Sequence, residues 1–326
     1  MLGLLLVALL APALMITAVR VLQPEGGRWI RLVSFTPYAI ALYAVALLLL
    51  LLVIAAGRGR RRRAGGLAAL LVAALLALHV FWASGPYAGE VAAAEGERFT
   101  VLTANLAIGD ADPSRVVDLA VKNDVDALVL SEITPLALRR MDAAGLSRAF
   151  PYAEGVTAPG VQGTMVFSTR APTDVTPLRT TFTGVATTFP IGAQGTLQLV
   201  AVHPHPPAGD AREWRADHQT IHDFVAQNEA AADATVIAGD FNATLDHEVM
   251  SDLEDLGFRS AADASNAQWQ PTWPSVRGMS PFGIDLPSLL QIDHVLVTGN
   301  AEAVNTESVT VQGTDHCAVV ATVTVQ

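Results

Sequence analysis

Acidic, amide and imidazole side chains recur at the ends of apolar, β-type runs in the last two-thirds of the sequence. Five short clusters follow one another, with one histidine between the second and the third: Asn105, Ser131-Glu132, His203, Gly239-Asp240-Phe241-Asn242, Ile292-Asp293-His294 and Thr314-Asp315-His316. Strands that end in such residues present them at one edge of a sheet. Carboxylate and amide oxygens suit a hard divalent cation, and carboxylates and imidazoles suit the activation of water. The clusters therefore predict a site for a metal ion, a water molecule and a phosphate group.

Two of these clusters indicate a role by their residue types alone. Glu132 follows a strand-like run. It is the strongest candidate for a metal ligand, because Mg²⁺ keeps several waters and needs only one or two carboxylates. Gly239 permits a close approach of backbone to ligand, and it places Asp240 and Asn242 at the same edge. An Asx-type turn after a strand is the alternative interpretation of this second cluster.

From about Arg98 to Gln326, the chain resembles the endonuclease/exonuclease/phosphatase superfamily. That group contains deoxyribonuclease I-like nucleases, abasic-site endonucleases, neutral sphingomyelinases and inositol polyphosphate phosphatases. The resemblance lies in six segments in a fixed order: Thr103–Leu106, Leu130–Glu132, Val202–Pro204, Gly239–Asn242, Gln291–Val295 and Thr314–Val319. One such segment is weakly specific, whereas six in order are specific. The resemblance implies a deoxyribonuclease I-like, four-layer α/β sandwich, and the chain is identified as a membrane-anchored bacterial member.

The resemblance also implies Mg²⁺-dependent hydrolysis of a phosphoester, with Mn²⁺ or Ca²⁺ as alternative ions. It places the metal ion on Asn105, Glu132 and Asp315. It also implies that Asp240 orients or deprotonates the attacking water and that Asn242 and His203 hold the phosphate oxygens. Asp293 and His316 then form a carboxylate–imidazole pair. The proton of the water passes either to Asp240 or to the Asp293–His316 pair, and the sequence leaves both routes open.

The remaining histidines offer a different interpretation. His294 adjoins Asp293 on one strand, so it points to the opposite face and is expected to be structural. His218 and His222 have the i, i+4 spacing of a zinc-binding helix, but the glutamate of the zinc protease motif is missing. We therefore expect these two, and His247, on helix surfaces.

The first 88 residues differ in composition from the rest. They hold eight Arg and one acidic residue, whereas residues 89–326 hold twelve basic and thirty acidic residues, a formal charge of −18. Apolar runs at 2–22, 34–56 and 67–84 predict three membrane spans, since about 20 apolar residues cross the hydrocarbon core. The third run is the shortest and contains His79. A cleaved signal peptide is the alternative for the first run, but it lacks the positive charge and the cleavage site.

An arginine run at 58–63 separates the second and third predicted spans. Clustered Arg in a short loop stays on the cytoplasmic side. The sequence thus predicts a multi-pass protein of the cell membrane with an internal N terminus, a linker at 89–97 and an extracellular catalytic domain at 98–326. Arg28 and Arg31 in the external loop weigh mildly against this orientation. A solvated linker or a nucleic-acid patch is the alternative interpretation of the run.

Local signals within the domain favour a mixed α/β class. Asp112-Pro113 and Thr134-Pro135 are typical of helix starts, with a capping side chain followed by Pro at the first helical position. Residues 211–228 have the periodicity of an amphipathic helix. The chain closes with three predicted strands, at 291–297, 303–311 and 318–325.

Charge limits the choice of substrate. Tight binding of duplex DNA usually requires a basic surface, and this acidic domain has a single lysine, Lys122. Trp269 and Trp273 are expected to stack on a base, to contact a lipid tail, or to plug their loop onto the core. We expect a phosphoester from nucleic acid or a phospholipid headgroup, with the lipid bilayer as the other partner and no obligate protein partner evident. The alternative is a non-catalytic membrane protein that binds a partner through this fold.

Overall fold

The chain folds into two compact units, which are described separately. The computed structural model describes residues 2–56, 59–89, 96–193, 195–275 and 286–326. One unit comprises Met1–Gly85 with Asp246–Glu248, and the other comprises Pro86–Leu245 with Val249–Gln326.

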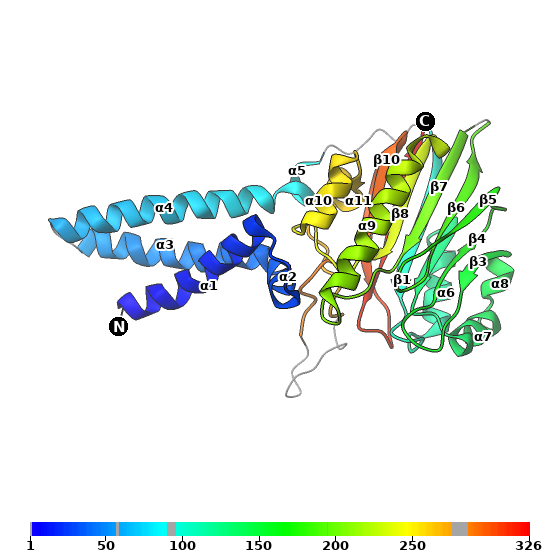
Figure 1. Cartoon of the computed structure of the whole chain (residues 1–326), viewed down its shortest axis with the longest axis horizontal. Coiled ribbons are helices and arrows are strands. Elements are labelled where there is room, and N and C mark those ends of the chain that lie inside the picture. The colour runs from blue at the N-terminus through cyan, green and yellow to red at the C-terminus, as the bar shows by residue number, and fades with distance from the viewer. Residues whose placement is uncertain (1, 57–58, 90–95, 194, 276–285) are drawn as a thin grey trace. The chain divides into compact units, whose positions relative to one another are not determined.

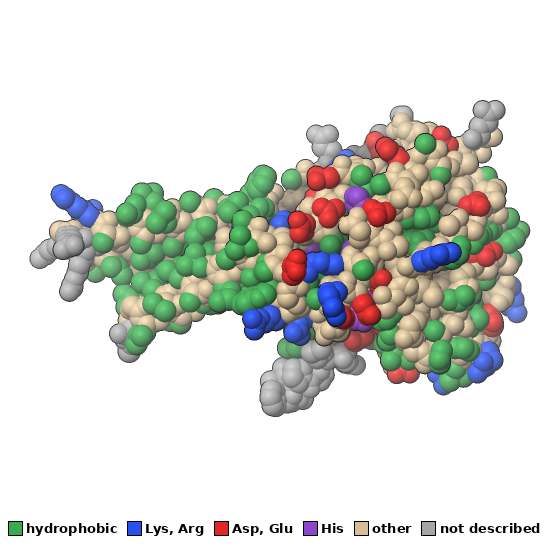
Figure 2. All heavy atoms as spheres, in the orientation of Figure 1, with side chains coloured by type: hydrophobic (Ala, Val, Ile, Leu, Met, Phe, Trp, Pro, Cys, Tyr) green, Lys and Arg blue, Asp and Glu red, His purple; other side chains and the backbone are tan. Residues whose placement is uncertain are grey.

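Three long apolar helices make up the first unit (Figure 1): α1 (Leu2–Leu22), α3 (Ala39–Ala56) and α4 (Arg60–Trp82). Two short elements, α2 (Gly27–Val33) and η1 (Thr36–Tyr38), connect the first two. Helix α3 packs against both α1 and α4. Three segments are long and apolar enough to cross a membrane by length and composition, namely Leu2–Leu22, Thr36–Ala56 and Arg62–Trp82. Hydrophobic side chains cover much of the outer surface of these helices (Figure 2).

A histidine inside an apolar helix is costly unless it is paired, and His79 of α4 is paired. Its side chain is buried, with Nε2 2.9 Å from the Thr17 hydroxyl and Nδ1 3.0 Å from the Thr36 carbonyl oxygen. The Thr17 hydroxyl also lies 2.6 Å from the Tyr43 hydroxyl. This network joins all three long helices, which explains how the third apolar run accommodates a titratable residue.

The arginine run is not the loop that the sequence predicted. Helix α4 begins at Arg60, so Arg60–Arg63 form its first turn, ahead of the predicted start at residue 67. Arginine is a good helix former, and long cationic side chains at the end of an apolar helix can reach water. Arg58 and positions 90–95 of the predicted linker lie outside the described residues.

The second unit contains two six-stranded sheets (Figure 1). The strands of the first sheet are, in order across it, β11 (Ala301–Thr310), β12 (Cys317–Val325), β1 (Glu97–Asn105), β2 (Ala127–Ser131), β4 (Thr164–Ser168) and β3 (Tyr152–Val156). Those of the second are β5 (Asp174–Leu178), β6 (Gly184–Ile191), β7 (Gly195–Val202), β8 (Ala234–Asp240), β10 (Asp293–Gly299) and β9 (Arg259–Ser260). Neighbouring strands are antiparallel except β1–β2 and β7–β8. Both sheets are therefore mixed.

A core of Val, Leu, Ala and Phe side chains fills the space between the sheets, and Phe99 and Phe189 meet within it. Burial of each large apolar side chain contributes about 1.5–3 kcal/mol. On the outside, α6 (Pro113–Lys122), α7 (Pro135–Ala143) and α8 (Leu146–Ala149) pack on the first sheet, and α9 (Ala211–Gln227) lies over the second (Figure 1). The shorter helices are α5 (Gly85–Ala88), η2 (Glu229–Ala231), α10 (Glu248–Asp255) and α11 (Ala261–Ala264). The predicted four-layer α/β sandwich is confirmed.

Both predicted helix starts are confirmed, and each follows a strand that carries a polar cluster. The Asp112 side chain accepts hydrogen bonds from the backbone N–H groups of Ser114 and Arg115, at the start of α6. The Thr134 hydroxyl accepts one from the N–H of Ala137, at the start of α7. Such caps contribute about 1 kcal/mol each. The caps fix where α6 and α7 begin, and so they fix the short connections that follow β1 and β2 and carry side chains of the site.

Candidate active site

Strand ends of the first sheet supply three of the predicted site residues. Asn105 is the last residue of β1, Glu132 directly follows β2, and His316 directly precedes β12. Strands β1 and β2 are parallel, so their carboxyl ends meet at one edge, and β12 runs antiparallel to β1 and begins at the same edge. The topology thus gathers residues that are more than two hundred positions apart in the chain.

The second sheet brings three more residues to the same place. His203 directly follows β7, Asp240 ends β8, and Asp293 begins β10 as the register partner of Asp240. Gly239 is required for this arrangement, because a Cβ at that position would lie 1.9 Å from the carbonyl oxygen of Val202. The close contact between β7 and β8 sets His203 beside Asp240.

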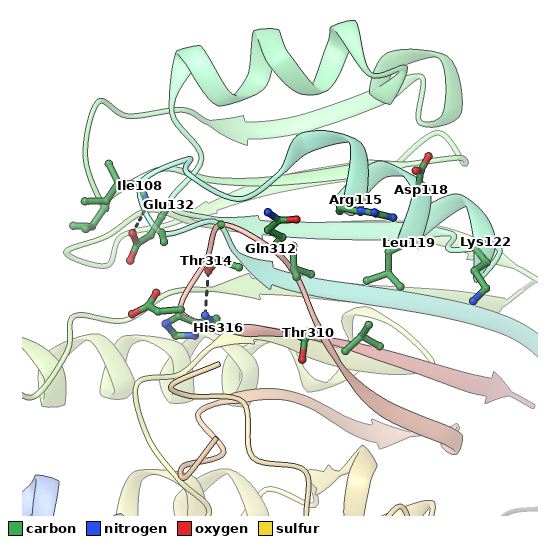
Figure 3. Close-up of a pocket in the computed structure, with 16 residues that line it drawn as sticks. Ile108, Arg115, Asp118, Leu119, Lys122, Glu132, Thr310, Gln312, Thr314 and His316 are labelled. Atoms are coloured by element: carbon green, nitrogen blue, oxygen red, sulfur yellow. Dashed lines mark hydrogen bonds between the residues drawn. The ribbon is translucent and has the colours of Figure 1, made fainter. Parts of the chain in front are cut away.

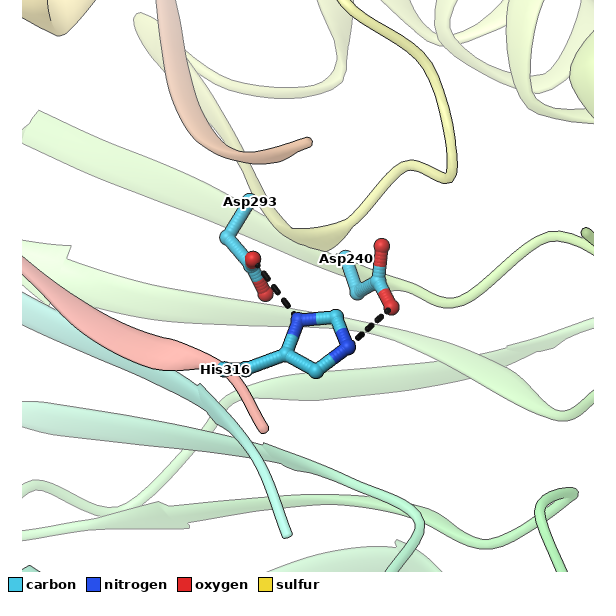
Figure 4. A group of neighbouring side chains, drawn as sticks. All are labelled: Asp240, Asp293 and His316. Atoms are coloured by element: carbon cyan, nitrogen blue, oxygen red, sulfur yellow. Dashed lines mark hydrogen bonds and ion pairs between the residues drawn. The ribbon is translucent and has the colours of Figure 1, made fainter. Parts of the chain in front are cut away.

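Asp240, Asp293 and His316 form a buried group (Figure 4). The imidazole of His316 lies between the two carboxylates, with Nδ1 2.9 Å from Oδ2 of Asp293 and Nε2 3.8 Å from Oδ2 of Asp240. One ligand atom from each of the three residues lies within 4.8 Å of the others. A buried group of two carboxylates and one imidazole can hold a metal ion.

Charges in this group act strongly on one another. Burial lowers the pKa of His316, but the charges of Asp293 and Asp240 outweigh burial and raise that pKa to about 10. Burial raises the pKa of Asp240, and the charge of Asp293 raises it further. A cation, whether a protonated imidazole or a metal ion, therefore stabilises the two carboxylates.

Asn105 connects this buried group to Glu132. Its side-chain N–H₂ donates to Oδ2 of Asp240 at 3.0 Å and to Oε1 of Glu132 at 3.2 Å. Its amide oxygen accepts from the N–H of Ala107 at 2.9 Å. In this arrangement Asn105 orients two carboxylates, and its own oxygen is already bonded to the backbone.

Glu132 adopts a conformation that L-residues avoid, with φ of 55°. Such strain costs about 1–3 kcal/mol and persists only where surrounding contacts hold it. Its Oε2 accepts from the N–H of Ile108 at 2.7 Å, and the Asn105 amide holds the other oxygen. Burial raises the pKa of Glu132, although both hydrogen bonds oppose this effect. The fold thus aims a carboxylate, partly removed from water, at the site.

His203 and Asn242 flank Asp240. Nε2 of His203 lies 3.6 Å from Oδ2 of Asp240, and burial lowers the pKa of His203 to about 4. The ring packs against Phe182. The backbone N–H of Asn242 donates to Oδ1 of Asp240, and its side chain donates to the carbonyl oxygen of Pro204. The predicted residues around the water and the phosphate therefore lie together.

An open groove of about 1460 Å³ leads to this group (Figure 3). Glu132, Asp315 and His316 line one end of it. The predicted metal residue Asp315 belongs to the lining rather than to the buried group, and its Oδ2 accepts a hydrogen bond from the indole N–H of Trp273 at 3.1 Å. This contact favours the interpretation that Trp273 anchors its loop. Positions 276–285 of that loop lie outside the described residues.

Two further residues hold the site together: Thr314, which the sequence analysis placed in a cluster without a role, and Asp217, which it missed. The Thr314 hydroxyl donates to the carbonyl oxygen of Asn105 at 2.8 Å and accepts from the N–H of His316 at 3.1 Å. The buried carboxylate of Asp217 on α9 accepts from the N–H of Thr181 at 2.7 Å and from the N–H of His205 at 2.8 Å. The sequence signal for Asp217 is a carboxylate on the apolar face of an amphipathic helix.

Three of the histidines assigned outside the site are also located. His294 is structural as predicted, because it is buried and its Nε2 lies 2.9 Å from the carbonyl oxygen of Ala243. The prediction of helix-surface positions was wrong for His218 and His247, which are both buried. His218 belongs to the apolar face of α9, and its Nε2 lies 3.0 Å from the carbonyl oxygen of Phe241.

Comparisons with known proteins agree with this geometry. Residues 102–316 match the profile of the Endonuclease/Exonuclease/phosphatase family. No curated protein matches the chain significantly. Among solved structures, a truncated TDP2 from Caenorhabditis elegans is 15% identical with a TM-score of 0.57, over 70% of this chain and 97% of that one. A conserved protein of unknown function from Enterococcus faecalis V583 is 17% identical with a TM-score of 0.55, over 70% and 100%.

A third solved structure is TDP2 from D. rerio in complex with a single-strand DNA product. It is 12% identical with a TM-score of 0.53, over 70% of this chain and 99% of that one. At such identities the likeness establishes a shared fold, which is the deoxyribonuclease I-like sandwich. The family profile covers about two-thirds of the chain, including the strand ends from Asn105 to His316. The chain belongs to the Endonuclease/Exonuclease/phosphatase family.

Proposed function

We propose that this protein is a membrane-anchored, metal-dependent hydrolase of phosphoester bonds. The observation that carries the proposal is the convergence of Asp240, Asp293 and His316 in one buried group, next to Glu132 at the end of an open groove. The family match supports phosphoester hydrolysis as the reaction class. The three long apolar helices support attachment to a membrane.

The chemistry of the donor set fits a divalent cation. Glu132 offers a carboxylate that is partly removed from water and held in place by Asn105 and Ile108. Asp240 and Asp293 add buried negative charge close by. Oxygen donors of this kind favour Mg²⁺, with Mn²⁺ and Ca²⁺ as alternatives. We assign Glu132 as the principal ligand, assisted by Asn105, which orients its carboxylate, and by Asp315 at the groove. The bound ion would supply positive charge to the phosphate oxygens and the leaving group.

Side chains of the protein then activate the attacking water molecule. The proton of the attacking water passes to Asp240, whose Oδ2 lies 3.8 Å from Nε2 of His316. The alternative acceptor is the Asp293–His316 pair. Asp293 holds Nδ1 of His316 at 2.9 Å, which fixes the tautomer and the direction of the ring. Proton transfer to a positioned side chain contributes about 10²–10⁴-fold to the rate.

His203 and Asn242 are placed to hold the phosphate. We assign both as donors to its non-bridging oxygens, since each lies directly beside Asp240. Donors aimed at the charge that develops in the transition state are commonly worth about 10²–10³ in rate. Burial keeps the His203 ring neutral at physiological pH, because its pKa is lowered to about 4. A neutral imidazole still carries one N–H for such a bond.

The test of this proposal is turnover by the full-length protein in detergent. With Mg²⁺ or Mn²⁺ it should hydrolyse bis(p-nitrophenyl) phosphate, and EDTA should stop the reaction because it removes the ion that offsets the charge on the phosphate oxygens and the leaving group. The same assay on plasmid DNA, RNA, sphingomyelin and phosphoinositides would identify the natural substrate class. Turnover that persists in EDTA would contradict the metal site, and no turnover on any substrate would favour a non-catalytic binding role.

The orientation of the protein in the membrane is a separate prediction. The first turn of α4 carries Arg60–Arg63, and clustered Arg near a span favours the cytoplasmic side. The span that follows then places the sandwich unit outside the cell. Protease added to intact cells should digest an epitope at the C terminus and leave a cytoplasmic control protein intact. Full protection of the epitope, with digestion after permeabilisation, would reverse the orientation.

A further inference from the structure

The groove extends well beyond the proposed catalytic group. Its far part is lined by one face of α6, which presents Arg115, Asp118, Leu119 and Lys122 at helical spacing. Figure 3 shows Arg115 and Lys122 at the opposite end of the groove from Glu132 and His316. A volume of about 1460 Å³ exceeds what a drug-sized ligand needs. A substrate reduced to one phosphate would leave most of the groove empty.

The charge of the groove changes along its length. Glu132 and Asp315 make the catalytic end acidic, whereas Arg115 and Lys122 make the far end basic. The unit that carries them is strongly acidic, and Lys122 is the only lysine in the sequence. Arg115 and Lys122 are therefore two basic residues on one helix face of a unit that is acidic as a whole.

Both cations are available to a ligand. Arg115 and Lys122 are exposed, and neither forms an ion pair within the described residues. At a rise of about 1.5 Å per residue they are separated by about 10 Å along α6. Asp118 stands between them on the same face and reduces their combined charge. Between its two ends the groove is lined by the uncharged polar side chains of Thr310 and Gln312.

We propose that Arg115 and Lys122 form a second anion subsite, which binds a further phosphate group of the substrate beyond the phosphate that is hydrolysed. The preferred substrates are then phosphoesters with at least two phosphates, bound along the groove. This inference rests on the proposed function, because the catalytic end fixes where the first phosphate lies. The shared chemistry is the second phosphate, which either a nucleotide strand or a polyphosphorylated headgroup supplies.

The test compares ligands that differ by one phosphate. One arm uses thymidine dinucleotide with and without a 5′-phosphate, and the other uses glycerophosphoinositol with and without a 4-phosphate. Affinity for the detergent-solubilised full chain is measured by competition against a fluorescein-labelled 5′-phosphorylated dinucleotide, in EDTA and in Mg²⁺. The added phosphate should strengthen binding at least about fivefold in one arm or both, as expected for two partly exposed cation–phosphate contacts. The arm that responds identifies the source of the phosphate.

Substitutions on α6 test whether the gain in affinity from the second phosphate depends on Arg115 and Lys122. Arg115→Gln with Lys122→Gln should remove the gain from the second phosphate and change binding of the singly phosphorylated ligands less than twofold. Asp118→Asn should increase the gain, because it removes the opposing charge. The matched control is Arg139→Gln with Arg140→Gln, which removes two exposed cations from α7 outside the groove lining and should leave the gain unchanged.

The outcomes separate this inference from the proposed function. Equal affinity for both members of each pair, or a gain that survives loss of Arg115 and Lys122, would overturn the second subsite even if bis(p-nitrophenyl) phosphate is hydrolysed. A gain that these variants remove would support the subsite even if no hydrolysis is detected, since the measurement is of binding. Where turnover is present, the double variant should raise KM for the doubly phosphorylated substrate at least about fivefold and leave kcat within twofold.

Discussion

Asp240→Asn is expected to lower kcat for bis(p-nitrophenyl) phosphate by about three orders of magnitude. The carboxylate lies 3.8 Å from Nε2 of His316 and 3.6 Å from Nε2 of His203, and it is the proposed acceptor of the proton of the attacking water. An amide of the same shape cannot accept the proton, and losses of about 10²–10⁴-fold are typical when a general base is removed. The measurement is kcat at saturating substrate and Mg²⁺.

The same substitution should leave the fold intact. Burial and the charge of Asp293 raise the pKa of Asp240, so its charged form is disfavoured in the folded protein. The neutral amide avoids that penalty and keeps one oxygen for the backbone N–H of Asn242, but it loses the bond from Asn105. Because these effects oppose each other, the midpoint of thermal unfolding should change by only a few degrees.

Asp252→Asn is the matched control, since it makes the same chemical change at an exposed position of α10. It should keep full activity. A loss of only twofold in the Asp240 variant would remove this carboxylate from the reaction. A collapse of its unfolding midpoint would assign Asp240 to stability, and His316→Ala would then be the test of proton transfer.

The strand ends were predictable from the sequence because polar residues interrupt strongly apolar runs there. Asn105, Glu132 and Asp240 each end or follow a buried strand, as the pattern indicated. The pairing of Asp293 with Asp240 across β8 and β10 was not predictable, since register depends on contacts between distant segments. The family resemblance predicted that these residues form one site, whereas the periodicity alone did not.

Other features could not be predicted because several conformations satisfy the same local pattern. His218 has the spacing of a surface zinc ligand, yet it faces the core because it shares the apolar stripe of α9 with Ile221. The arginine run suits either a loop or a first helical turn, and α4 extends over it because arginine is itself a good helix former. Arg115 and Lys122 resemble ordinary helix-surface cations until the groove places them opposite His316.

Glu132→Gln is expected to change the metal dependence of the reaction and not only its rate. The assigned ligand loses its charge, although its length and part of its hydrogen bonding remain. Loss even of residues that only support a metal ligand typically costs about 10–100-fold in metal affinity, so loss of a ligand's charge should cost at least that. At about 1 mM Mg²⁺ the rate should fall about 100-fold, and the midpoint of the Mg²⁺ titration should rise at least about tenfold.

The comparison with Asp240→Asn separates the two roles. Excess Mg²⁺ should restore part of the activity of Glu132→Gln, because occupancy limits that variant, and it should restore none to Asp240→Asn, where proton transfer is lost. Glu302→Gln, at an exposed position of β11, is the control and should titrate as the unmodified protein does. An unshifted midpoint of the Mg²⁺ titration in the Glu132 variant would mean that the metal ion does not bind at the groove end. The buried group of Asp240, Asp293 and His316 would then be the remaining metal site among the described residues, because its ligand atoms already lie within 4.8 Å of one another.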